Sequence, residues 1–152
     1  DTRVEKLLDE LEGVINKVKR VKNKGEENRK EVRKFYTEFA RRYQAQDEYG
    51  VLSLLADEWE AADGTTIWEL EETLMRNFRV FDEITYKISN FEIIEERNNN
   101  LYLVHYDLKI VSYIYSQNIE HQELSSVREI VEIKRDGLGR VIKTVGGRFW
   151  KE

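Results

Sequence analysis

Few side chains in this sequence are of the types that perform acid–base or metal chemistry, and their spacing keeps them apart. His105 and His121 are the only imidazoles, and they stand on either side of a predicted hairpin turn near Gln117. In such a hairpin, residues whose numbers sum to about 234 face each other, which places His105 opposite Glu129 and His121 opposite Tyr113. The two histidines then lie far apart, which argues against a shared metal, and His105 with Glu129 is predicted to be a cross-strand polar pair.

Nucleophilic and phosphate-binding motifs are also missing. The register above places no histidine beside Ser125 or Ser126, so a nucleophilic triad has no support. The chain has no cysteine, which excludes disulfides, thiolate chemistry and cysteine zinc sites. Four C-terminal glycines lack the spacing and the following helix of a phosphate-binding loop: Gly137, Gly139, Gly146 and Gly147. We therefore predict no cofactor and no metal.

Composition indicates one folded domain with a well-solvated surface. The chain has 152 residues, of which 40% are hydrophobic and 36% charged, with a net charge of −5. An acidic balance argues against nucleic acid as a partner, and no apolar run is long enough to insert into a membrane. Because the sequence begins at Asp1 without a methionine, we expect that a segment upstream, such as a signal or an anchor, was removed. The compartment stays open, with a periplasmic or envelope location favoured over the cytoplasm.

The elements that must position these side chains begin with helices. Apolar residues recur at alternating steps of three and four over residues 2–23, which predicts an amphipathic helix with a heptad seam. The seam consists of Val4, Leu7, Leu11, Val14, Val18 and Val21, widened by Leu8 and Ile15. The run Asn23–Gly25 is a predicted stop. We expect this helix to be docked, either on the outer face of its own sheet or against a second copy.

Three more helices are predicted before any strand. The first runs from Glu26 to Gln46, with an apolar stripe of Val32, Phe35, Tyr36, Phe39 and Tyr43. Asp47 is positioned to cap a short helix over 48–58. Thr65 or Thr66 is expected to cap a helix that extends to about Asp82, and Thr66 with Glu69 has the spacing of a capping box.

From Ile84 the apolar period changes from about 3.6 to 2, which predicts antiparallel strands. A parity break at Ser89–Asn90 predicts a bulge that bends the first strand. Turns are predicted at Arg97–Asn100, 116–118 and Asp136–Gly139, separating strands over Leu101–Tyr115, Ile119–Lys134 and Arg140–Trp150. The two long strands carry apolar residues on both faces, so we expect helices on one face and the N-terminal helix or a second subunit on the other.

This order of elements resembles the nuclear transport factor 2-like superfamily, also called SnoaL-like or cystatin-like, over about residues 28–152. The segments that carry the resemblance are Val32–Tyr36, Arg41–Tyr43, Asp47, Leu54–Trp59, Asp63–Thr65, Glu69–Leu70, Arg140–Ile142 and Gly146–Trp150. The resemblance, closest to envelope-associated bacterial members, implies a cone in which a bent sheet wraps the long helix around a cavity. It also implies dimers through the outer sheet face, and it implies no particular reaction.

Within this superfamily, enzymes of the ketosteroid isomerase type use a buried tyrosine and two carboxyl groups in an apolar cavity, and the resemblance offers candidates for such a set. The tyrosine would be Tyr36 or Tyr43, with Asp57 or Asp63 as one carboxyl group and Asp107 as the other. Asp107 shares its strand face with His105 and Lys109, which favours a solvated or ion-paired residue. The candidate catalytic set is Tyr43, Asp57 and Asp107.

The sequence predicts an α+β domain over residues 26–152 in which helices precede a curved four-stranded antiparallel sheet, with residues 1–25 as a tether or dimerisation helix. Expected cavity-lining residues are Tyr36, Phe39, Tyr43, Trp59, Phe78 and Tyr106, and expected interface residues are Leu11, Ile15, Tyr113 and Tyr115. We expect a non-catalytic binding or interaction module, dimeric and part of a larger or anchored bacterial protein. A lyase or isomerase acting on a small hydrophobic ligand in the cone is the alternative, so enzyme activity stays open.

Overall fold

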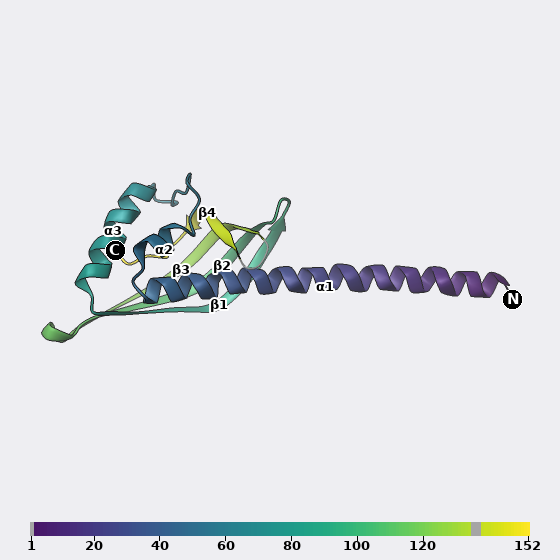
Figure 1. The fold of residues 1–152 in the computed structure, drawn as a ribbon, viewed down its shortest axis with the longest axis horizontal. Coiled ribbons are helices and arrows are strands. Elements are labelled where there is room, and N and C mark those ends of the chain that lie inside the picture. The colour runs from purple at the N-terminus through teal and green to yellow at the C-terminus, as the bar shows by residue number, and fades with distance from the viewer. Residues whose placement is uncertain (1, 135–137) are drawn as a thin grey trace.

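The computed structural model describes residues 2–134 and 138–152, with side chains described outside residues 19–24. Helices come first and a four-stranded antiparallel sheet follows, in the order β1-β2-β3-β4 (Figure 1). The elements are α1 Thr2–Gln44, α2 Glu48–Leu52, α3 Ile67–Val80, β1 Glu83–Arg97, β2 Leu101–Ile114, the 3-10 turn η1 Tyr115–Gln117, β3 Ile119–Ile133 and β4 Gly139–Gly146. The predicted α+β class and the order of its elements are confirmed.

Helix α1 is one unbroken helix, so the predicted stop at Asn23–Gly25 is wrong. A glycine inside a helix costs only about 1 kcal/mol relative to alanine. Gly25 stays in the helix, because positive φ among the described glycines occurs only at Gly64 and Gly147. Helix-forming residues on both sides, with no proline in the chain, carry the helix through. The expected boundary at residue 25 therefore falls inside a continuous helix.

The two shorter helices begin where their caps predict. The Asp47 side chain accepts a hydrogen bond from the Gly50 amide at the start of α2. Thr66 accepts from the Glu69 amide at the start of α3, as the capping box requires. Helix α2 ends at Leu52, well before the expected residue 58, because the chain there turns to form a bridge between Leu55 and β4.

The sheet is bent by irregularities in its two outer strands. The β1–β2 register shifts between Ser89 and Glu92, where Asn90 adopts a φ of 51°, which confirms the predicted bulge. Strand β4 ends at Gly146 rather than at Trp150. Gly147 turns the chain with a φ of 69°, and this turn directs the last aromatic side chains into the core. The predicted turn at Asp136–Gly139 lies partly outside the described residues.

The β2–β3 register differs by one residue from the prediction. Asn118, at a φ of 51°, closes the hairpin after η1, and Val104 rather than His105 pairs with Glu129. Arg128 is the partner of His105. Because successive strand residues point to opposite faces, this single step moves Glu129 from the outer face of the sheet to the inner one.

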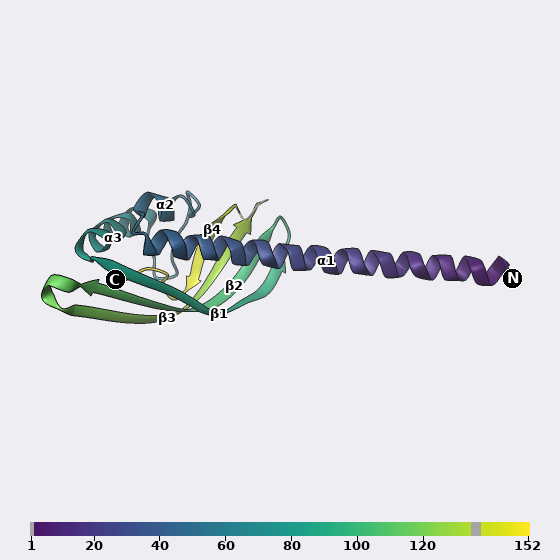
Figure 2. The ribbon, with the colours of Figure 1, turned by 60° about the horizontal axis from the view of Figure 1, so that its bottom comes forward.

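The core lies between the concave face of the sheet and the second half of α1. Figures 1 and 2 show the sheet curving beneath α1, with α2 and α3 closing one end. The stripe of Val32, Phe35, Tyr36, Phe39 and Tyr43 is buried as expected. Inner-face residues of β2, including Tyr106 and Ile110, complete the core from the other side.

The first half of α1 projects away from this body (Figures 1 and 2). Its described stripe is 45–65% exposed at every position: Val4, Leu7, Leu8, Leu11, Val14, Ile15 and Val18. The expectation that this helix docks on its own sheet is therefore wrong for the single chain, and a second copy remains as the expected surface. Among the described helices, none has the length and apolar character needed to cross a membrane.

Candidate functional site

A buried carboxylate lies at the centre of the cone. Glu129 is fully buried on the inner face of β3, beside Val104 of β2. Its neighbours on the same face of β3 are the buried Val127 and Val131. A charged group on an otherwise apolar face is costly to bury without partners, so its surroundings decide what Glu129 can do.

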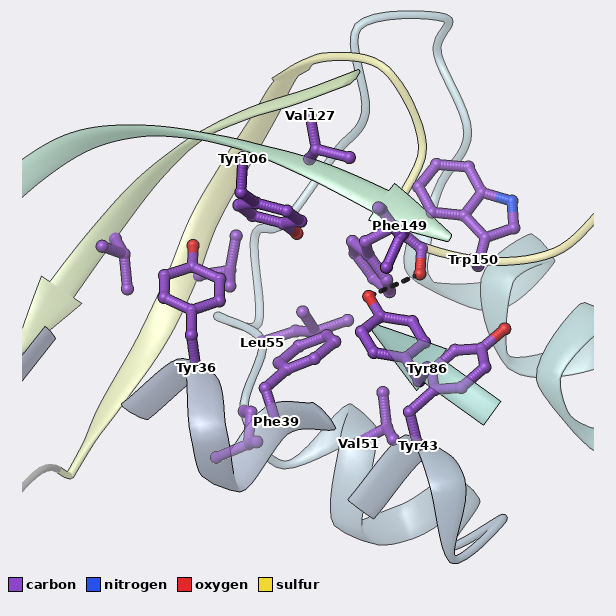
Figure 3. Close-up of a cluster of buried hydrophobic side chains, with 14 of the residues drawn as sticks. Tyr36, Phe39, Tyr43, Val51, Leu55, Tyr86, Tyr106, Val127, Phe149 and Trp150 are labelled. Carbon is purple, nitrogen blue, oxygen red and sulfur yellow. Dashed lines mark hydrogen bonds between the residues drawn. The ribbon is translucent and has the colours of Figure 1, made fainter. Parts of the chain in front are cut away.

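Three hydroxyl groups, one each from α1, β2 and β4, converge on this carboxylate. The Tyr36 and Tyr106 hydroxyls donate to Glu129 Oε1 at 2.9 and 2.7 Å, and Figure 3 shows both rings reaching into the same interior. The Thr144 hydroxyl donates to Oε2 at 2.7 Å, and the Trp59 indole Nε1 donates to Thr144 Oγ1 at 3.0 Å. Both carboxylate oxygens are therefore hydrogen-bonded within the protein.

Burial and hydrogen bonding act in opposite directions on the acidity of Glu129. Removal from water raises its pKa, and the hydrogen bonds from Tyr106, Thr144 and Tyr36 partly offset that rise. Burial likewise raises the pKa of Tyr36 and Tyr106, and the nearby Glu129 charge raises both further. This chemistry suits a proton acceptor in an apolar site, provided that a reactant can reach it.

Aromatic side chains fill the space around the Glu129 cluster. Tyr86 donates to the Phe149 carbonyl at 2.8 Å, as Figure 3 shows. The Phe149 ring packs edge-on to Phe39 at 5.1 Å and lies 5.6 Å from Trp59. The residues expected to line a cavity are all buried in this core: Tyr36, Phe39, Tyr43, Trp59, Phe78 and Tyr106. They fill the interior by packing on one another.

The structure does not bring the candidate catalytic set of Tyr43, Asp57 and Asp107 together. Tyr43 is buried near α3, where it accepts a hydrogen bond from the Lys151 amide and where burial raises its pKa. Asp57 is exposed on the loop after α2. Asp107 is half-buried on the outer face of β2 and accepts from Asn90 Nδ2 at 2.8 Å.

Asp63, the other carboxyl candidate, lies in a surface turn. Hydrogen bonds from Thr65 lower its pKa, and its carboxylate lies 3.3 Å from Arg148 Nε. It is thus a solvated, ion-paired residue and does not reach the cone interior.

The outer sheet face carries one contact that the sequence register excluded. His105 Nε2 lies 2.7 Å from the Ser126 hydroxyl, and His105 Nδ1 lies 3.4 Å from Glu92 Oε1. The expectation that no histidine stands beside the serines is therefore wrong, because the true register brings Ser126 diagonal to His105. The Glu92 side chain is 65% exposed, so this row is a solvent-facing polar network.

The expected interface residues occupy two separate surfaces. Leu11 and Ile15 are exposed on the projecting part of α1. Tyr113 and Tyr115 stack with ring centroids 5.9 Å apart at the end of the β2–β3 hairpin. In the described part of the chain, no three histidine or carboxylate side chains are grouped as metal ligands.

Glu129 and its partner Thr144 are the residues of this site that the sequence interpretation missed. For Glu129 a signal was present. Its signal lies in the alternation of β3, where Val127, Val131 and Ile133 share one parity and Glu129 interrupts them. A single charged residue on an apolar parity indicates a buried polar group. The one-residue error in register hid that signal by pairing Glu129 with His105.

Comparison with known proteins supports the fold at low sequence identity. No family model matches this sequence, and no curated protein matches it. Solved structures do match. A protein from Novosphingobium aromaticivorans provisionally named a scytalone dehydratase superposes with a TM-score of 0.70 at 11% identity, covering 86% of this chain and 93% of that chain. A nuclear transport factor 2-like superfamily protein from Salmonella enterica gives 0.64 at 9% identity, covering 84% and 94%.

This chain has the nuclear transport factor 2-like fold. A type 2 hexachlorocyclohexane dehydrochlorinase, LinA, also superposes, with a TM-score of 0.59 at 16% identity, covering 79% of this chain and 83% of that chain. These matches support the resemblance drawn from residues 28–152. Since nuclear transport factor 2-like folds carry unrelated activities, the function must be argued from the site itself.

Proposed function

We propose that this chain is a non-catalytic binding and interaction module of nuclear transport factor 2-like fold that pairs with a second copy through the projecting part of α1. The observation that carries the non-catalytic part is the closed state of Glu129. Its oxygens accept hydrogen bonds from Tyr36, Tyr106 and Thr144, and the side chain is fully buried. Because the side chain is fully buried, a substrate could reach this carboxylate only by opening the packed core around it. Displacing one of the three hydroxyl groups would cost about 1–3 kcal/mol for each hydrogen bond left unmade.

Hydroxyl proton exchange tests whether the interior is closed. We expect the Tyr36 and Tyr106 hydroxyl protons to give separate proton NMR signals that exchange slowly with water, assigned through Tyr36→Phe and Tyr106→Phe. Tyr49, which is 65% exposed, is the control, and its hydroxyl signal should be lost to exchange. Rapid exchange at Tyr36 and Tyr106 would show an interior open to solvent and would favour an enzyme.

The pairing proposal rests on the exposed stripe and its flanking charges. With heptad positions counted from Val4 as a, the flanking e positions are Leu8 and Ile15, and the g positions include Glu10 and Lys17. An antiparallel pair brings e next to e and g next to g, which sets Leu8 against Ile15 of the second copy. The same geometry sets Glu10 against Lys17 of the second copy, so the charges are complementary.

A parallel pair satisfies these flanking positions less well. There a g residue meets an e residue of the other helix, so Glu10 would lie against Ile15. Burial of a large aliphatic side chain contributes about 1.5–3 kcal/mol, and the exposed stripe leaves that contribution unused in a single chain. We therefore assign the antiparallel arrangement.

Mass in solution tests the pairing. Leu11→Asp with Ile15→Asp should give a monomer by sedimentation equilibrium, with the far-ultraviolet spectrum of the body retained. The control changes exposed residues off the stripe, Glu5→Gln with Glu12→Gln, and should stay dimeric. A native chain that is monomeric at about 100 μM, a concentration at which a micromolar pair is formed, would contradict the proposal.

We also propose that this chain is part of a larger, envelope-associated bacterial protein. In its support, the fold occurs as one part of a longer chain in Bdellovibrio bacteriovorus Bd1075, which matches with a TM-score of 0.62 at 14% identity. That match covers 76% of this chain and 40% of the other. Detection of the native protein in fractionated cells, with an antibody against residues 28–152, tests both its size and its location.

A lyase or isomerase is the second candidate, favoured by the raised pKa of Glu129 and by the names of the structural neighbours. In this reaction class Glu129 would take a proton from carbon, and a tyrosine hydroxyl would stabilise the oxyanion that forms. The catalytic set would then be Glu129 with Tyr36 and Tyr106, in place of Asp57 and Asp107. Rapid hydroxyl exchange, followed by loss of turnover in Glu129→Gln, would establish this candidate.

A further inference from the structure

A surface groove runs between α1 and the edge strand β1, outside the filled cone. Its volume is about 600 Å³, within the range of about 300–1,000 Å³ that small-molecule sites occupy. The apolar lining of the groove consists of Ala40 on α1 and of Tyr86, Ile88 and Phe91 on β1. The β1 residues form its floor. Because β1 is the edge of the described sheet, no described strand lies along this side of the floor.

The bulge in β1 creates the floor. The register shift after Ser89 turns Phe91 inward, where its ring lies 5.2 Å from that of Tyr36. Ala40 sits one turn further along α1 on the same face, and its short side chain leaves space above the rings of Tyr86 and Phe91. The groove is therefore a hollow built from small and aromatic side chains, with Tyr36 between it and Glu129.

The rim of the groove is cationic although the chain as a whole is acidic, with a net charge of −5. Arg33, Arg41 and Lys87 border it. Arg41 is held by Glu38, with Nε 2.8 Å from Oε2. Among the described residues, no carboxylate forms an ion pair with Arg33 or Lys87. Arg33 lies one turn before Tyr36, which contacts Phe91 at one end of the groove. Lys87 follows Tyr86, whose amide donates to Gln44 Oε1 at the other end, so one cation with no described ion pair stands at each end of the apolar hollow.

We propose that this groove binds a small organic anion with an apolar body, such as a medium-chain carboxylate. The chain of the ligand would lie on Ile88 and Phe91, and its carboxylate would face Arg33 at the Phe91 end of the groove. Burial of the apolar body supplies affinity, and the Arg33 cation selects an anion over a neutral analogue. This assignment concerns the outside of the cone and does not depend on whether Glu129 is catalytic.

Titration of the full chain with decanoate, below its micelle concentration, tests the site by nitrogen-15 NMR. We expect amide shifts confined to residues 33–44 and 84–91, and decanol should bind at least about fivefold more weakly. At about 4 Å in a water-like dielectric, one ion pair corresponds to about a fivefold change in affinity. Arg33→Gln with Lys87→Gln should therefore weaken decanoate binding by about fivefold.

The matched control removes the same charge from the other side of the body. Arg76→Gln with Arg79→Gln on α3, both exposed, should leave decanoate affinity unchanged within twofold. Ala40→Phe should block binding by filling the hollow, and its unfolding midpoint shows whether it folds. Shifts confined to the exposed stripe of α1 would overturn the assignment. Equal binding of decanol, or equal loss in both charge variants, would overturn it as well.

Discussion

Replacement of Glu129 by leucine should destabilise this protein severely, whereas replacement by glutamine should not. Glu129→Leu keeps the side-chain volume but removes the acceptor of the Tyr36, Tyr106 and Thr144 hydroxyls. Each buried donor left unmatched costs about 1–3 kcal/mol, so the three together cost about 3–9 kcal/mol. A domain of this size is stable by only about 5–15 kcal/mol, so this loss is a large share of the whole.

Glutamine retains an oxygen that can accept from both tyrosines, and it removes a buried charge whose desolvation is unfavourable. Its amide group meets Thr144, which already accepts from Trp59, so one hydrogen bond is lost or reversed. We expect Glu129→Gln to change the free energy of unfolding by less than about 1.5 kcal/mol, the net value of one hydrogen bond.

Urea denaturation followed by tryptophan fluorescence measures both variants, because Trp59 and Trp150 are buried beside the site. Measurements at several protein concentrations separate unfolding from dissociation of the pair. Should Glu129→Leu prove as stable as Glu129→Gln, the three hydroxyl groups would have to find other partners, and the reasoning about a satisfied, closed cluster would be refuted.

Because burial raises the folded-state pKa of Glu129 above its ordinary value of 4.5, its protonated form stabilises the fold below about pH 4.5. That contribution is lost at about 1.4 kcal/mol per pH unit as the pH rises through the folded-state pKa; Glu129→Gln should remove this slope in unfolding titrations. The chain has no cysteine, so single cysteines can report the pairing of the helices. A mixture of Leu7→Cys and Val18→Cys should form an inter-chain disulfide on mild oxidation, whereas either variant alone should not. The opposite pattern on a non-reducing gel would indicate parallel helices. Gly147→Ala should lower stability by about 3 kcal/mol or more, because φ is +69° and the added Cβ would lie 2.0 Å from the Ser126 carbonyl oxygen; an unchanged melting temperature would contradict this.

The parts of the fold that local rules govern could be predicted from the sequence. Capping at Asp47 and Thr66 and the bulge at Ser89–Asn90 depend on neighbouring residues, so each is visible in a short window. The break expected at Gly25 was wrong because a glycine only weakens a helix. The residues on both sides of Gly25 are helix-forming, so α1 continues through this position.

The candidate site depended on a contact between distant residues, and a local pattern could not supply it. The hairpin register depends on how η1 and Asn118 close the turn, and one residue of error reverses the faces of β3. Glu129 thereby moved from a surface pair to the interior, where Tyr36 from α1 and Thr144 from β4 meet it. The convergence of four elements is a property of the tertiary structure alone.

Because α1 is unbroken, the rise of the helix sets the distance between the two bodies of a pair. With antiparallel pairing, residues whose numbers sum to about 25 face each other, and the buried part of α1 begins near Val32 in each copy. At about 1.5 Å per residue, the two Val32 positions lie about 58 Å apart. A flexible linker of the same length would give a broad spread of separations. This chain would instead form a dumbbell with a stiff spacer, holding its two grooves too far apart for one small ligand to bridge.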